Sequence, residues 1–139
     1  MNAIARGTFV VKLAPLPLEG QGPVSEDSQC TDAKLARLAI DKQIEGDLVA
    51  TTRGQMLSAT TATAGSAGYV AIERVQGTLH GRRGSFVLQH SGTMNRGTPQ
   101  LTVTVVPDSA TGELLGLNGS FRILVAEGRH RYEFDYALP

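Results

Sequence analysis

Apolar and polar residues alternate along most of the chain, and short turn-rich stretches separate the alternating runs. A period of two is typical of strands that bury one face. The clearest example spans residues 69–106, where Gly-Arg-Arg-Gly and Asn-Arg-Gly-Thr separate three such runs. The runs are rich in β-branched and aromatic residues, which favour strands, and the glycines favour tight turns. The pattern predicts an antiparallel meander.

Two-residue loops at 82–83 and at 96–97 set the predicted pairing of this meander. The first loop places Val75 opposite His90, and the second places His90 opposite Val103. Both registers turn the same apolar face inward, and a slip of one residue would expose that face. The predicted inward residues are Tyr69, Ala71, Glu73, Val75, Leu79, Phe86, Leu88, His90, Leu101, Val103 and Val105.

The residues before the meander predict three further strands. Strands are expected at 5–13 and 48–60, and a proline-containing loop at 14–29 is either a mobile surface loop or a lid or partner segment. Residues 31–44 fit either a helix with an N-cap or a strand. We favour a strand over 35–43, although Lys42 interrupts its apolar face.

The residues after the meander predict two more strands, joined by a tight loop at 127–128. The first covers 115–125, and the second turns alternate residues from His130 to Leu138 inward. This pairing places Phe121 opposite Phe134. The total is about eight strands in one domain, residues 1–139. We expect an all-β fold, a single closed antiparallel barrel, because closure removes exposed strand edges.

The composition indicates which classes of binding partner and which cellular compartment to expect. The formal net charge is zero, with 13 basic and 13 acidic residues and no basic run, which argues against nucleic-acid binding. Cys30 is the single cysteine, so no internal disulfide is possible, as is usual in a reducing compartment. The first residues lack the layout of a signal peptide, and no apolar run is long enough to span a membrane. We therefore expect a cytoplasmic protein.

Several phrases of the sequence resemble a family of uncharacterised bacterial proteins with an allene oxide cyclase-like, calycin-type barrel. They lie at residues 44–48, 68–74, 84–90, 106–114 and 130–136. The resemblance runs from about Thr8 to Leu138 and implies an eight-stranded barrel that forms oligomers. It implies no activity, and no active-site residue of the plant cyclase has a counterpart here.

Glu73 and His90 are the candidate catalytic residues, because they face inward as diagonal neighbours on adjacent strands, roughly 7–8 Å apart. We expect their side chains to lie within about 4–6 Å of each other, or to share a water molecule, at the wall of the main pocket. The pair is either an acid–base couple or a buried ion pair that satisfies two polar groups. Tyr69 and Tyr132 are further candidates for ligand binding, or core residues with a polar tip.

No metal site or cofactor is predicted, because the three histidines, His80, His90 and His130, are far apart in the sequence and no phosphate-binding motif is present. The two arginines at 82–83 suit a solvated turn better than a phosphate site.

Three functions remain open. The first is a barrel that binds a small, mostly apolar molecule, the second an isomerase or cyclase that uses the same pocket, and the third a structural protein with a solid core. A homo-oligomer is expected, because the outward face of the meander carries few charges (Val87, Gln89, Thr102, Thr104).

Overall fold

The computed structural model describes residues 2–18 and 33–139, and most of this part of the chain is in strands. The prediction of an all-β fold is confirmed. The strands are β1 (Asn2–Leu16), β2 (Lys34–Gly46), β3 (Leu48–Thr60), β4 (Ala67–Leu79), β5 (Arg82–Asn95), β6 (Thr98–Val105), β7 (Asn118–Ala126) and β8 (Arg129–Ala137), and the short 3-10 helix η2 covers Gly112–Leu114.

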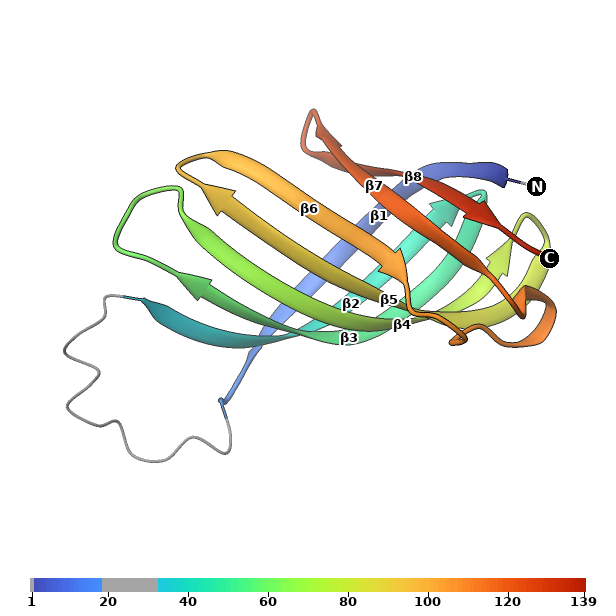
Figure 1. The fold of residues 1–139 in the computed structure, drawn as a ribbon, viewed down its shortest axis with the longest axis horizontal. Helices are drawn as coiled ribbons and strands as arrows, with labels where there is room; N and C mark the ends of the chain where they lie inside the picture. The colour runs from blue at the N-terminus through green and yellow to red at the C-terminus, as the bar shows by residue number, and fades with distance from the viewer. Residues whose placement is uncertain (1, 19–32) are drawn as a thin grey trace.

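The eight strands form one closed antiparallel barrel, as predicted (Figure 1). Each strand pairs with the next one in the chain, and β8 pairs with β1 to complete the circle. The segment for which a helix was the alternative is β2, in which Ile40, Lys42 and Ile44 are buried and alternate with exposed residues. Lys42 therefore belongs to the inner face of this strand, together with its apolar neighbours.

The barrel core lies on the inward face of the strands, as the alternation predicts. Three phenylalanines form its aromatic centre. The ring of Phe134 lies 4.1 Å from that of Phe121 and 5.8 Å from that of Phe86, measured between centroids. Leu114 of η2 and Leu117 are buried as well, so η2 closes one end of the core. Burying each large apolar side chain stabilises the fold by about 1.5–3 kcal/mol.

The predicted register between β4 and β5 is wrong. The two-residue turn is His80-Gly81 rather than 82–83, so His90 lies opposite Ala71 and Val75 lies opposite Phe86. Both turn residues have positive φ, 47° and 81°, which matches the type I′ turn that suits the twist of a hairpin. The shift from the predicted partner is four residues, an even number, so every side chain keeps its predicted face.

The other two predicted pairings are confirmed. His90 lies opposite Val103 across β5 and β6, and Phe121 lies opposite Phe134 across β7 and β8. The strand predicted over 115–125 is β7, which begins three residues later because η2 and the following turn occupy residues 112–117.

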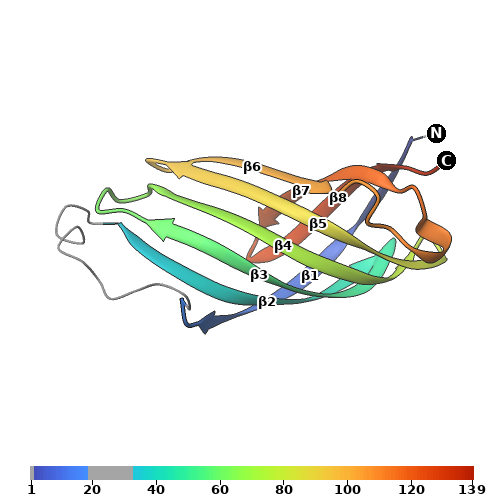
Figure 2. The ribbon, with the colours of Figure 1, turned by 60° about the horizontal axis from the view of Figure 1, so that its bottom comes forward.

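The barrel is closed unevenly. β6 pairs with β7 only at Val103 and Thr104, and β1 pairs with β8 only as far as Phe9. Beyond these points β1–β6 continue as an open trough, and β6 and β7 diverge (Figures 1 and 2). Leu101, predicted on the buried face, is 41% exposed because it lies along this trough, and Met94 is exposed to the same extent.

Candidate functional site

Four polar side chains from four neighbouring strands meet inside the barrel. They are Lys42 of β2, Thr52 of β3, Glu73 of β4 and His90 of β5, and all four are buried. Each occupies an inward position of its strand. Lys42 lies opposite Thr52 across β2 and β3, and Glu73 is two residues from Ala71, the partner of His90. We call these four residues the buried polar cluster.

Glu73 is the centre of the buried polar cluster, and both of its carboxylate oxygens are used. Oε1 accepts a hydrogen bond from Lys42 Nζ at 2.9 Å and lies 2.6 Å from His90 Nε2, while Oε2 accepts from Thr52 Oγ1 at 2.8 Å. Lys42 Nζ also lies 4.9 Å from the centroid of the Phe9 ring, a cation–π contact. The predicted proximity of Glu73 and His90 is confirmed.

The charge state of Glu73 follows from these contacts. Burial raises the pKa of this carboxyl, but the hydrogen bond from His90 and the positive charge of Lys42 outweigh burial and lower its pKa to about 2. Glu73 is therefore ionised at neutral pH. An ionised carboxylate only accepts hydrogen bonds, so Nε2 of His90 carries the proton in their shared bond.

Tyr69 extends the buried polar cluster toward the trough. Its ring lies 6.3 Å from the His90 ring, tilted by 46°. Burial, and next the negative charge of Glu73, raise the pKa of the Tyr69 phenol, so its hydroxyl keeps its proton at neutral pH. Three of the four predicted site residues, Tyr69, Glu73 and His90, are thus brought together.

Tyr132, the fourth predicted site residue, is engaged elsewhere. Its hydroxyl accepts a hydrogen bond from the backbone N–H of Leu48 at 3.1 Å and lies 2.9 Å from the carbonyl oxygen of Glu45, to which it donates. Burial, more than any other factor, raises the pKa of this phenol. The hydroxyl thereby joins β8 to the turn between β2 and β3.

Replacing Tyr132 with phenylalanine is expected to destabilise the barrel by about 1–3 kcal/mol, because the buried N–H of Leu48 loses its partner. Tyr136→Phe is the matched control. The Tyr136 hydroxyl bonds to Nδ1 of the partly exposed His80, where water can replace it, so we expect a smaller loss. Urea unfolding at pH 7 measures both. Equal losses would contradict this role for Tyr132.

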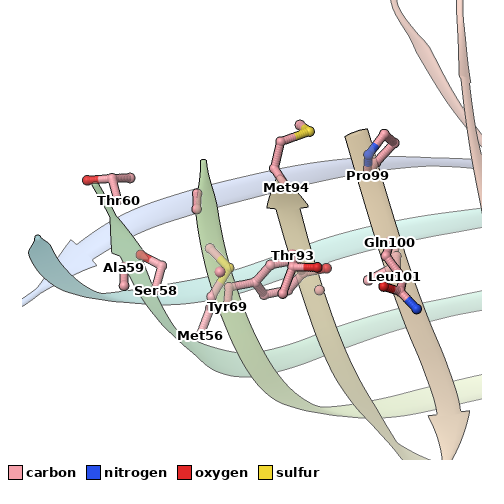
Figure 3. Close-up of a pocket in the computed structure, with 13 residues that line it drawn as sticks. Met56, Ser58, Ala59, Thr60, Tyr69, Thr93, Met94, Pro99, Gln100 and Leu101 are labelled. Carbon is pink, nitrogen blue, oxygen red and sulfur yellow. The ribbon is translucent and has the colours of Figure 1, made fainter. Parts of the chain in front are cut away.

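Three cavities lie at or near the buried polar cluster, and they differ greatly in size. The largest, about 750 Å³, includes His90 in its lining together with exposed residues such as Leu57, Val70 and Ile72. The one bounded by Lys42, Glu73 and His90 holds only about 10 Å³, room for about one water molecule. The third, about 340 Å³, lies in the trough, and Tyr69 lies in its wall (Figure 3). We call it the trough pocket. Its lining residues are Met56, Ser58, Ala59, Thr60, Ala67, Gly68, Tyr69, Gly92, Thr93, Met94, Pro99, Gln100 and Leu101.

The trough pocket can hold an uncharged, mostly apolar molecule. None of its lining residues carries a charge, and side chains from β3, β4, β5 and β6 surround it (Figure 3). Among the described residues the Tyr69 hydroxyl has no hydrogen-bond partner, so it is available to a bound molecule. Glu73 and His90 do not line this pocket. Both border the cavity of about 10 Å³, and His90 also borders the cavity of about 750 Å³. Tyr69 lies between these two residues and the trough pocket.

Other predicted features lie away from this site. His80 is in the β4–β5 turn, and the ring of His130 stacks on Phe9. Within residues 2–18 and 33–139, no three His, Cys, Asp or Glu side chains come together as metal ligands. The same residues include no helix of the length and apolarity that a membrane span requires. Cys30 and most of the predicted loop at 14–29 lie outside the described residues.

Residues 5–136 match the family model described as "Protein of unknown function (DUF3224)". The chain belongs to the DUF3224 family. A crystal structure of a protein with unknown function from the same family, from Shewanella oneidensis MR-1, is 45% identical to this chain. The match covers 100% of this chain and 98% of the other, with a TM-score of 0.90. No curated protein matches the chain.

The affiliation confirms the predicted resemblance to uncharacterised bacterial proteins, and the similar structure supports the same fold. Two members of the site in this DUF3224 protein, Lys42 and Thr52, were not among the predicted residues. Lys42 carried a detectable signal, a cation at an apolar position of a strand, which needs a buried acid nearby. Thr52 carried none, because threonine is common on either face of a strand.

Proposed function

We propose that this DUF3224 protein binds a small, uncharged and mostly apolar molecule in the trough pocket. The observation that carries the proposal is a cavity of about 340 Å³ with an uncharged lining and one available polar group, the Tyr69 hydroxyl. Ligand sites are usually apolar concavities with a few placed polar groups. The allene oxide cyclase-like, calycin-type relationship belongs to the same proposal, since some eight-stranded barrels hold one small ligand whereas others are filled by side chains.

The proposal assigns separate roles to the candidate residues. Tyr69 contacts the ligand through its hydroxyl, as its place in the pocket wall allows. Glu73 and His90 are positioning residues. His90 supports the Tyr69 ring from behind, and Glu73 fixes the orientation of the His90 imidazole through the 2.6 Å contact. The rigid wall lowers the conformational entropy that a ligand must remove on binding.

The neutral fluorescent probe N-phenyl-1-naphthylamine tests the pocket. We expect the wild type to bind it with enhanced fluorescence, and Leu101→Arg to weaken binding at least tenfold because a cation then lies in the apolar wall. Leu57→Arg, at a 51% exposed position that does not line the trough pocket, is the control and should change binding less than twofold. Equal loss in both variants, or binding unaffected by Leu101→Arg, contradicts the proposal.

An isomerase or cyclase that uses the same pocket is the second candidate. It is favoured by the Tyr69–His90–Glu73 series, in which a phenol, an imidazole and an ionised carboxylate lie in sequence. Native mass spectrometry of the protein purified from its own host would identify a retained molecule. A retained molecule that the wild type converts, and that Tyr69→Phe binds but leaves unchanged, would favour the enzyme.

A further inference from the structure

Among residues 2–18 and 33–139, no strand pairs with the edge of β6 that borders the trough pocket. β6 pairs with β5 along its whole length, from Thr98 to Val105. Its other edge pairs with β7 only at Val103 and Thr104. Residues 98–102 therefore present an unpaired edge at the place where the barrel opens.

The direction of the backbone groups on this edge follows from one hydrogen bond. The N–H of Val106 donates to the carbonyl oxygen of Val87 on β5, at 2.9 Å. Backbone groups alternate in direction along a strand, so even-numbered residues of β6 point to β5 and odd-numbered residues point away. The N–H and C=O of Leu101, and the C=O of Pro99, are thus directed at the open edge.

The proline supports this assignment, because it has no N–H to give. A proline inside a sheet is tolerated where its nitrogen faces away from the neighbouring strand. Pro99 and Leu101 also turn their side chains inward and line the trough pocket. The pocket therefore has an unpaired backbone donor and two unpaired acceptors along one wall.

We propose that β6 binds an extended apolar peptide segment by antiparallel strand addition, with alternate peptide side chains in the trough pocket. The inference rests on the proposed function and defines its ligand class. Strand addition matches the free donor and acceptors of Leu101, and pockets for alternate side chains supply specificity. An uncharged pocket selects apolar side chains at those alternate positions.

A second copy of the chain is the competing occupant of this edge. It is less suited, because β7 of the same barrel occupies this edge at Val103 and Thr104 and leaves only residues 98–102 for a second barrel to approach.

The probe is the capped peptide acetyl-Ser-Leu-Thr-Leu-Ser-amide, in which leucines alternate with polar residues. It should displace N-phenyl-1-naphthylamine from the wild type. The leucines are expected to lie opposite Pro99 and Leu101, whose backbone groups point away from β5. In that position each leucine directs its N–H to the backbone of β6 and its side chain into the trough pocket. Methylation of the two leucine nitrogens should weaken binding at least fivefold, since two hydrogen bonds to the protein are lost. Methylation of the backbone nitrogens of the central threonine and of the last serine of the peptide should leave binding within threefold.

Amide hydrogen exchange locates the bound peptide. In the free protein the amide of Leu101 should exchange faster than that of Thr102, whose N–H points to β5. A saturating peptide concentration should slow exchange at Leu101 at least tenfold and leave Thr102 unchanged. Equal affinity of both methylated peptides, or unprotected Leu101 in the complex, overturns the inference.

Two further outcomes separate this inference from the small-molecule proposal. If the naphthylamine binds and the peptide neither displaces it nor protects Leu101, strand addition is wrong and the pocket proposal stands. If the naphthylamine does not bind but the peptide protects Leu101, strand addition stands and the small-molecule proposal is wrong. Protection of Leu101 without peptide that rises with protein concentration, together with a dimer mass by light scattering, assigns the edge to a second copy and overturns the inference.

Discussion

Replacing Glu73 with leucine is expected to destabilise the barrel by about 3–5 kcal/mol. The reason is the ammonium group of Lys42, which is 10% exposed at its side chain and would lose its carboxylate partner inside the barrel. His90 and Thr52 would lose their shared acceptor at the same time. Urea unfolding at pH 7 measures the loss in the free energy of unfolding. The slope of this free energy against urea concentration should be the same in both proteins.

The double variant Lys42→Met with Glu73→Leu is the informative control. A buried ion pair that is replaced by apolar residues of similar size often costs little, whereas removal of one partner leaves a buried charge. We therefore expect the double variant to recover more than half of the stability lost by Glu73→Leu alone. Equal or additive losses would show that the two side chains are not coupled, which contradicts the 2.9 Å contact as the origin of the effect.

The same double variant separates structural from functional use of the buried polar cluster. If stability recovers and binding in the trough pocket is unchanged, the buried polar cluster has a structural role only, in the packing of the barrel interior. If stability recovers but binding falls, His90 and Glu73 act on the ligand through Tyr69, as the ring contact at 6.3 Å suggests. Ligand binding by the double variant, measured alongside its stability, therefore distinguishes the two interpretations.

The predicted proximity of Glu73 and His90 was right although the pairing beneath it was wrong. The predicted partner of His90, Val75, and the observed partner, Ala71, lie on either side of Glu73 at the same spacing. An even shift of register preserves the face of every side chain. The diagonal relation is preserved because the shift is four residues and Glu73 lies midway between the two partners. The faces of the strands follow from alternation alone, whereas the register depends on turn conformation. His80 adopts positive φ there, which is uncommon for any residue other than glycine.

The open trough could not be predicted from the alternation. A strand that closes a barrel and a strand that ends at a free edge carry the same period of two, so Leu101 and Val103 look equivalent in the sequence. Their difference arises from where β7 stops pairing with β6, which depends on the contacts of several strands at once. The pocket was therefore assigned to the closed part of the barrel, where the side chains of Phe121, Phe134 and Tyr132 leave little space.

Acidification is expected to remove about 3 kcal/mol of stability through Glu73 alone. In the folded barrel the pKa of this carboxyl is about 2, below its ordinary value of 4.5, because the bond from His90 and the charge of Lys42 outweigh burial. A lowered pKa in the folded state means that the unfolded chain binds the proton more tightly. The stabilisation is therefore fully present above about pH 5 and is lost as the pH falls from there toward 2.

The free energy of unfolding of the wild type and of Glu73→Gln, measured in urea at pH 7, 5, 4 and 3, tests this pH dependence. Glutamine has no titrating carboxyl, so the difference in stability between the two proteins should shrink steadily below pH 5. Glu133→Gln is the matched control. Its carboxylate contacts Arg6 at the surface, where ion pairs contribute little, so its difference from the wild type should stay nearly constant. A difference between wild type and Glu73→Gln that is the same at pH 7 and pH 3 would show that Glu73 is not held ionised by the buried polar cluster.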